Sequence, residues 1–234
     1  MTGTAQPQYL FVIRHGDRWD YENKKLWTEH GSNRKGDPPL SALGHEQARD
    51  VGRYLDSFFE EKGIKASDIT WLSSPFLRCL QTSTEALAVM HKVEGSTQIP
   101  IYPEDGVFEW DDANGSWHAD LPPKEERIHY FPRLLTTAAT YQPLYVPPIP
   151  EPLANFDARC QTTLDALHKR HSFQPNTALV VVSHAACCIS FVAAAAQKSK
   201  ADITPAAPCS IYQLSRTSNA PTAWALDDHD VAGS

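Results

Sequence analysis

The sequence lacks an excess of positive charge. It has 21 Lys and Arg against 28 Asp and Glu, which gives a formal net charge of −7 with neutral His. A surface of this sign does not attract nucleic acid or anionic membranes, so we expect neither as a partner. Any anion that the protein binds must be held by a local cluster of positive groups, which makes the position of each Arg informative.

Cysteine is sparse and odd in number. Two of the five Cys residues are adjacent and none belongs to a C-x-x-C pair, so a disulfide scaffold and a closed zinc site are both excluded. The pattern favours reduced thiols, as in the cytoplasm or alternatively the nucleus. The first residues show no basic stretch followed by an apolar run, so we expect no secretory signal.

Long apolar runs are also rare. Residues 178–196 form one that is almost wholly apolar and about long enough to cross a bilayer. The run contains Ser183, His184 and Ser190, and it changes midway from β-branched to Ala-rich residues. That change is typical of a buried strand followed by a helix, so we expect no membrane span.

The sequence does contain a regular alternation of short apolar strands and amphipathic helices. Strands are expected at 9–13, 69–73, 99–102, 179–183, 211–214 and 222–226, and helices at 41–61, 75–90, 155–170 and after His184. This order predicts an α/β fold, a three-layer sandwich in which a largely parallel sheet is flanked by helices. Ser74 is expected to cap its helix, with Pro75 at the first helical position.

The domain organisation that we expect is simple. Residues 1–234 should form a single domain, because no repeat and no second core is visible. Residues 1–8 are expected to be a flexible tail. The Pro-rich segment 103–152 loses helical and strand periodicity, so it is predicted to be a long irregular insertion over the active site.

The expected ends of four strands all lead to charged or polar residues. The first strand is followed by Arg14-His15-Gly16-Asp17-Arg18, the second by Arg78, the third by Glu109 and the fourth by His184. In open α/β sheets the functional crevice lies beyond the carboxyl ends of the strands. The convergence of these residues on one edge predicts a site there, although each residue alone is a weak signal.

The residue types in this set suit phosphoryl transfer. A neutral imidazole such as that of His15 is an effective nucleophile toward phosphorus, and Gly16 would let the chain bend sharply beside it. Arg14 and Arg18 would neutralise phosphoryl oxygens, since a guanidinium fork can hold two oxygens at once. Arg78 is expected in the first turn of a helix, near free backbone N–H groups, where anions bind favourably.

Purely structural explanations exist for the same residues. The segment 14–16 could be a strand end with solvated charges beside it. Arg78 could pair with Glu85 on the surface of its helix. His184 could be a buried histidine bonded to the backbone, as isolated histidines often are, instead of a phosphate donor at a helix N-terminus.

Aromatic residues surround the expected site. Phe108 and Trp110 could shield Glu109 from water, as a general acid requires. Trp19, Trp110 and Trp117 could stack on an aromatic leaving group and bind substrate in this way, or they could pack beneath the insertion.

Together these segments resemble the histidine phosphatase superfamily, also called the phosphoglycerate-mutase-like fold, over nearly the whole chain. The resemblance rests on RHGDR at 14–18, PLSALGHEQA at 39–48, SSPFLRCLQT at 73–82, VFEW at 107–110 and VVSHA at 181–185. FEW, the His184-Ala185 pair and PCS at 208–210 are most similar to the phosphatase domains of ubiquitin-associated and SH3-domain-containing proteins. Only the catalytic module of those proteins is matched.

The resemblance implies a phosphomonoester hydrolase that needs no metal and no cofactor. His15 would accept the phosphoryl group, and Glu109 would protonate the leaving oxygen and then assist water. Arg14, Arg18, Arg78 and His184 would form the phosphate pocket. The substrate would be a small-molecule or phosphopeptide phosphomonoester; the sequence does not indicate an oligomeric state.

Two alternatives remain open from the sequence. A binding or scaffold protein could keep this fold with weak catalysis. A cofactor-dependent phosphoglycerate mutase is also compatible, because Lys124, Arg127 and Arg133 in the insertion could grip a substrate carboxylate. Such a mutase usually has a small polar residue after RHG, whereas this chain has Asp17-Arg18-Trp19.

Overall fold

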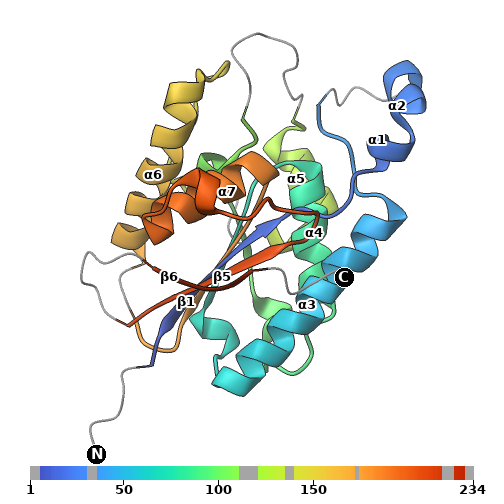
Figure 1. The fold of residues 1–234 in the computed structure, drawn as a ribbon. Helices are drawn as coiled ribbons and strands as arrows, with labels where there is room; N and C mark the ends of the chain where they lie inside the picture. The colour runs from blue at the N-terminus through green and yellow to red at the C-terminus, as the bar shows by residue number, and fades with distance from the viewer. Residues whose placement is uncertain are drawn as a thin grey trace, which may run out of the picture.

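The fold is built on a six-stranded mixed sheet with the strand order β3-β2-β4-β1-β5-β6 (Figure 1). The computed structural model describes residues 6–30, 36–110, 121–134, 140–171, 174–217 and 224–229. The strands are β1 (Gln8–Arg14), β2 (Ile69–Ser73), β3 (Ile101–Pro103), β4 (Ala178–Ser183), β5 (Ile211–Arg216) and β6 (Ala225–His229). Strands β3, β2, β4 and β1 pair in parallel, whereas β5 and β6 add antiparallel pairs at one edge.

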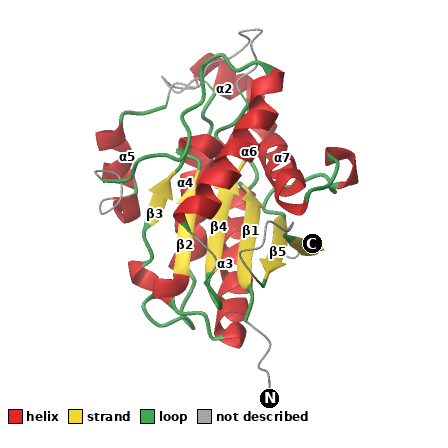
Figure 2. Cartoon of the chain, turned by 90° about the vertical axis from the view of Figure 1, so that its left-hand side faces the viewer, coloured by secondary structure: helices red, strands yellow, loops and turns green. Residues whose placement is uncertain are grey.

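Helices cover both faces of the sheet (Figures 1 and 2). The α-helices are α1 (Trp19–Glu22), α2 (Lys24–His30), α3 (Ala42–Lys62), α4 (Leu77–Ala88), α5 (Lys124–Tyr130), α6 (Leu153–Arg170) and α7 (Ala185–Ala196). Short 3-10 turns are η1 (Ala66–Asp68), η2 (Ser96–Gln98), η3 (Asp105–Val107), η4 (Pro132–Leu134) and η5 (Lys200–Asp202).

Strand β1 shows why the fold has three layers. Its side chains alternate between two separate apolar clusters. Phe11 and Ile13 join the cluster that includes residues of α3 and α4, whereas Leu10 and Val12 join the cluster that includes residues of α6 and α7. A strand buried on both faces must be continuously apolar, as residues 9–13 are. The predicted α/β sandwich is confirmed, with the antiparallel β5 and β6 as the departure from parallel pairing.

The ends of helix α3 follow from local sequence. The Ser41 side chain accepts a hydrogen bond from the Gly44 N–H, and Gly63 ends the helix in the left-handed conformation with φ of 66°. The observed helix therefore lies within one residue of the predicted 41–61.

The prediction that Ser74 caps the next helix is wrong. Helix α4 begins at Leu77, with Phe76 at the N-cap position. The Leu77 N–H donates instead to the carboxylate of Asp37 at 2.8 Å, and the Ser74 hydroxyl bonds to His184. The carboxylate of Asp37, which is distant in the sequence, thus accepts a free N–H group at the start of the helix. The Ser74 hydroxyl is therefore available to bond within the site.

The remaining segments agree in part with expectation. The apolar run 178–196 is β4 followed by α7, and no described helix is long and apolar enough to span a bilayer. The last strand begins at Ala225, three residues later than predicted, and residues 222–223 lie outside the described ranges. Gln8, placed in the expected tail, is buried in β1.

The segment 103–152 contains more regular structure than predicted, including η3, α5 and η4. Glu104 attaches it to the sheet edge: its buried carboxylate accepts bonds from the Gly106 N–H, the Tyr141 hydroxyl and the Leu144 N–H, at 2.7, 2.6 and 2.9 Å. Burial raises the pKa of Glu104, although these donors oppose the shift. The boundaries of the insertion and its place over the active site stay predictions.

Candidate active site

The turn after β1 holds His15 in a tightly packed place. Its N–H donates to the Ser183 carbonyl at the end of β4, at 2.9 Å. A Cβ atom on Gly16 would lie 2.5 Å from the Gly44 oxygen, and one on Gly44 would lie 2.2 Å from the Asp17 oxygen. The backbone approach between this turn and the start of α3 therefore requires glycine at both positions.

The hydrogen bonding of His15 defines its tautomer. Its Nδ1 lies 2.7 Å from the Gly16 carbonyl oxygen. Because a carbonyl only accepts hydrogen bonds, Nδ1 carries the proton and the lone pair is on Nε2. Burial, followed by the positive charge of Arg78, holds the pKa of His15 well below its usual 6.5. His15 is therefore a neutral imidazole, the nucleophilic form.

His184 has the opposite tautomer. The ring is fully buried at the N-cap of α7, and Arg78 Nη2 donates to its Nδ1 at 3.1 Å. Since a guanidinium only donates, Nε2 of His184 carries the proton and donates to the Ser74 hydroxyl at 2.9 Å. Burial, followed by the positive charge of Arg78, lowers the pKa of His184 well below 6.5.

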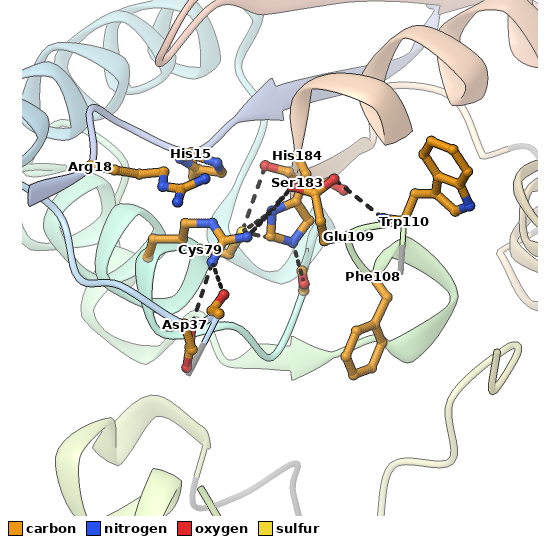
Figure 3. Close-up of polar contacts among 12 residues, drawn as sticks. His15, Arg18, Asp37, Cys79, Phe108, Glu109, Trp110, Ser183 and His184 are labelled. Atoms are coloured by element: carbon orange, nitrogen blue, oxygen red, sulfur yellow. Dashed lines mark hydrogen bonds and ion pairs between the residues drawn. The ribbon is translucent and has the colours of Figure 1, made fainter. Parts of the chain in front are cut away.

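Arg78 joins the polar groups of the site, including the His184 ring and the Glu109 carboxylate that Figure 3 shows. Its side chain is 1% exposed, and the guanidinium lies 3.6 Å from Asp37 Oδ1 and 3.5 Å from Glu109 Oε2, over the Phe76 ring. The alternative pairing with Glu85 is not observed, because that carboxylate accepts from His45 and Arg49. Arg78 is thus a buried positive charge between the site's two histidines and its carboxylates.

Glu109 reaches the same cluster from the loop after β3. Its Oε2 lies 3.4 Å from His184 Nδ1, and its side chain is 19% exposed. The neighbouring aromatic rings extend away from it: Phe108 packs edge-on against Phe76, and Trp110 packs against Phe156 (Figure 3). They fix the loop and do not shield the carboxylate, which differs from the expectation.

Arg14 and Arg18 lie at the periphery of this cluster, and both charges contribute to the lowered pKa of His15. Arg14 donates to the Ala206 carbonyl and the Tyr21 hydroxyl, at 2.8 and 3.2 Å. Arg18 makes a bidentate pair with Asp20 at 3.0 and 2.7 Å. Within the described chain, the buried Nε atoms of Arg14 and Arg78 have no hydrogen-bond partner.

The three tryptophans that were predicted to bind substrate differ in their surroundings. Trp19 packs edge-on against Trp27 with ring centroids 6.3 Å apart. Trp110 donates its indole N–H to the Glu151 carbonyl at 3.0 Å. Trp117 lies outside the described residues. Substrate binding by these three side chains stays a prediction.

The basic residues of the insertion lie in two different places. Arg133 donates to the carbonyl oxygens of Ser96, Thr97 and Ile99 through Nη1, so it holds backbone and does not offer a free cation. Lys124 and Arg127 instead line a cavity of about 200 Å³ together with Asp105 and Tyr141. The three basic residues therefore do not form one carboxylate-binding group.

One group of potential metal ligands coincides with the site. His15, Glu109 and His184 offer ligand atoms that all lie within 4.8 Å of one another. Two imidazoles and a carboxylate suit several divalent ions. The Arg78 guanidinium lies within 3.5 Å of two of them and would repel a cation, so the charge arrangement favours an anion.

Four residues that shape the site were not predicted from the sequence. Ser74 had a signal, a strand end beside the predicted helix, but it was interpreted as a cap. Asp37 had none, because only the folded chain brings it to Leu77 and Arg78. Glu151 and Arg159 also had none: they pair with each other and support the Glu109 loop.

A comparison with models of protein families shows to which family the chain belongs. The model of the histidine phosphatase superfamily (branch 1) matches residues 10–229. The chain belongs to this superfamily. Its resemblance to that family in motifs 14–18, 73–82 and 181–185 is therefore confirmed over nearly the whole length.

Curated relatives match over a smaller part. Human ubiquitin-associated and SH3 domain-containing protein A is 30% identical over 136 residues, which cover 47% of this chain and 19% of that protein. The yeast transcription factor tau 55 kDa subunit is 27% identical over 101 residues, 43% of this chain and 20% of that protein. The chain thus aligns with only about a fifth of the length of these relatives.

Solved structures show the same fold. The ecdysone phosphate phosphatase from Bombix mori, in complex with tungstate, has a TM-score of 0.67 and 18% identity, with 88% of both chains covered. The mycobacterial glucosyl-3-phosphoglycerate phosphatase has a TM-score of 0.56 and 19% identity, covering 95% of this chain and 98% of that one.

Proposed function

We propose that the protein is a phosphomonoester hydrolase that forms a phosphohistidine on His15. The observation that carries this proposal is the bond from His15 Nδ1–H to the Gly16 carbonyl, at 2.7 Å. It leaves the Nε2 lone pair on a neutral ring, beside a buried guanidinium. A phosphate ester needs this combination of nucleophile and positive charge.

In the first step, His15 Nε2 attacks phosphorus, the N–P bond forms and the P–O bond to the leaving group breaks. Glu109 gives its proton to the departing oxygen. Arg14, Arg18 and Arg78 hold the phosphoryl oxygens, with the unpartnered Nε–H groups of Arg14 and Arg78 as donors, and His184 joins them once anion binding has protonated it. Positioning and charge neutralisation account for most of the acceleration.

In the second step, water attacks the phosphorus and the N–P bond breaks. Glu109, now ionised, takes a proton from that water, and inorganic phosphate leaves. His15 returns to the neutral state in which it began, so the cycle consumes one water molecule and no cofactor. The fixed guanidinium groups supply the positive charge that a metal ion would otherwise provide, so the proposed reaction needs no metal.

The substrate is proposed to be a small-molecule or phosphopeptide phosphomonoester. Similar structures include phosphatases described for ecdysone phosphate and for glucosyl-3-phosphoglycerate, which differ widely in the alcohol they release. The described Cys residues are all free and buried, which supports a reducing compartment, the cytoplasm or the nucleus.

Rapid-quench trapping tests the proposal. Wild-type protein mixed with radiolabelled 4-nitrophenyl phosphate should carry an acid-labile, base-stable phosphoryl group, and the His15→Ala variant should carry none and show no turnover. The His91→Ala variant, which replaces an exposed histidine of a surface loop, is the matched control and should retain both. Binding of phosphate esters without label or turnover in the wild type would favour the scaffold alternative instead.

A further inference from the structure

A buried ion pair lies behind the loop that carries Glu109. Arg159 on α6 donates from Nε and Nη2 to the two carboxylate oxygens of Glu151, both at 2.8 Å. Their side chains are 0% and 1% exposed. The Arg159 guanidinium also lies over the Phe156 ring, 5.0 Å from its centroid. The pair is bidentate and shielded from water.

The remaining donor of this guanidinium bonds to the catalytic loop. Arg159 Nη1 donates to the carbonyl oxygens of Gly106 and Phe108, at 3.0 and 3.1 Å. Phe108 directly precedes Glu109 in the chain. Arg159 therefore fixes the peptide unit from which the Glu109 side chain extends.

Other bonds hold the same loop from its opposite sides. The Ser183 hydroxyl donates to the Val107 carbonyl at 2.7 Å. The Trp110 indole donates to the backbone carbonyl of Glu151, at 3.0 Å. Each carbonyl from residue 106 to 108 thus accepts a bond from a distant element, and Glu151 is linked to the loop on both sides of Glu109.

The contacts of the Glu109 carboxylate itself are longer. Oε2 lies 3.4 Å from His184 and 3.5 Å from Arg78, and Oε1 accepts from the Trp110 N–H at 3.2 Å. Contacts of this length hold a side chain weakly. The position of the carboxylate therefore depends on the backbone around it.

Stability alone is a poor explanation for this pair. Removing two charges from water costs about as much as their attraction returns, so a buried ion pair is often no better than apolar side chains of the same volume. Apolar replacements could not, however, donate to two carbonyls in fixed directions. The planar guanidinium does so while Glu151 fixes its orientation.

We propose that Arg159, oriented by Glu151, is a positioning residue that sets the Glu109 carboxylate for proton transfer to the leaving oxygen. This inference rests on the proposed acid role of Glu109. It follows that Arg159 influences the first step only as far as the leaving group needs a proton.

The test compares two esters of similar shape. Phenyl phosphate needs a proton on its leaving oxygen far more than 4-nitrophenyl phosphate does. In single-turnover measurements, Arg159→Lys should slow the first step with phenyl phosphate by about 10-fold or more, and with the nitrophenyl ester by less than about 3-fold. Lysine keeps the charge but cannot bridge a carboxylate and two carbonyls at once.

A matched control and a double variant separate positioning from general stability. Arg133→Lys removes a comparable guanidinium-to-carbonyl set that has no contact with the Glu109 loop, so its effect should be equal on both esters. Added to Glu109→Gln, Arg159→Lys should cause little further loss, because coupled residues are not additive. If Arg159→Lys does not fold, Glu151→Gln serves the same comparison.

The outcomes are distinct. Equal losses on both esters in Arg159→Lys, or full additivity with Glu109→Gln, would overturn the inference alone. If Glu109→Gln itself shows no dependence on the leaving group, the acid role fails and the inference fails with it.

Discussion

Arg78 Nη2 donates to Nδ1 of His184 at 3.1 Å, so the His184 ring presents a lone pair and not a proton to the site. Burial and the charge of Arg78 keep the pKa of this ring low, and the neutral state agrees with that bond. An oxyanion entering the site needs donors, and a lone pair would repel it. Anion binding should therefore raise the pKa of His184 and protonate it.

The first prediction is that anion binding takes up a proton. Sulfate is a suitable probe because it stays a dianion throughout the neutral pH range. We expect calorimetry in buffers of different ionisation enthalpy to show uptake of up to about one proton per sulfate, with tighter binding as the pH falls from about 8 to 6. In His184→Gln the uptake should disappear; unchanged uptake in that variant would assign the proton to another group.

The second prediction concerns Glu109→Gln. The variant keeps size and hydrogen bonding but has no transferable proton. We expect the single-turnover rate to fall roughly 10²-fold on phenyl phosphate and clearly less on 4-nitrophenyl phosphate. Steady-state kcat is unsuitable, because slow dephosphorylation of His15 could hide the difference.

Asp105 provides the comparison for that experiment. Burial raises its pKa to about 6, a value suited to an acid, but the side chain lines the cavity with Lys124 and Arg127. Asp105→Asn should therefore affect both esters equally. A leaving-group dependence in this variant, and none in Glu109→Gln, would transfer the acid role to Asp105.

The third prediction is that chelators leave turnover intact while vanadate inhibits it. The Arg78 guanidinium lies within 3.5 Å of two of the three potential ligands, His184 and Glu109, and disfavours a cation. Activity should survive dialysis against EDTA and should not rise when divalent ions are added. Loss on dialysis with recovery on addition of one ion would instead identify His15, Glu109 and His184 as ligands.

The fourth prediction is that His168 makes the stability of the fold depend on pH, with the protein losing stability as the pH is lowered from 6.5 to 4. The Trp224 indole donates to its Nε2 at 2.7 Å, and burial with the charge of Arg216 lowers the pKa of His168 to about 4. Above pH 6.5 the ring is neutral in both folded and unfolded chains. Between pH 6.5 and 4 only the unfolded chain takes up the proton, so the free energy of unfolding decreases as the pH is lowered through this range.

Denaturant unfolding of His168→Gln can measure this contribution. The difference in the free energy of unfolding between wild type and variant should be largest near pH 7 and shrink toward pH 4. A difference that stays constant, or grows as the pH falls, would contradict the assignment. The exposed His91→Gln variant serves as the comparison.

Local signals predicted much of the fold. Helix α3 was placed within one residue because its apolar period, Ser41 cap and Gly63 stop all lie within the segment itself. The same is true of β1 and β4, whose apolar runs are continuous. The expected convergence of His15, Arg78, Glu109 and His184 followed from strand polarity alone, and the structure brings these four together.

Features that depend on distant partners were not predictable in this way. Ser74 has the residue type of a cap, but its partner is a histidine that only the folded sheet brings near. Glu151 and Arg159 are eight positions apart and share no helical face or strand register that would indicate a pair. Tautomers, buried ion pairs and the direction of aromatic side chains all follow from packing between segments.

The central place of β1 in the sheet has a consequence for how the protein folds. Tyr9 pairs with Ala178 on one side and with Ser215 on the other, so both neighbours of this strand come from far along the chain. Neither ladder can form before a ribosome has synthesised those residues, and closing such long loops has a large entropic cost. Of the strands in this sheet, the one that delivers His15 is thus the first to be made and among the last to be enclosed.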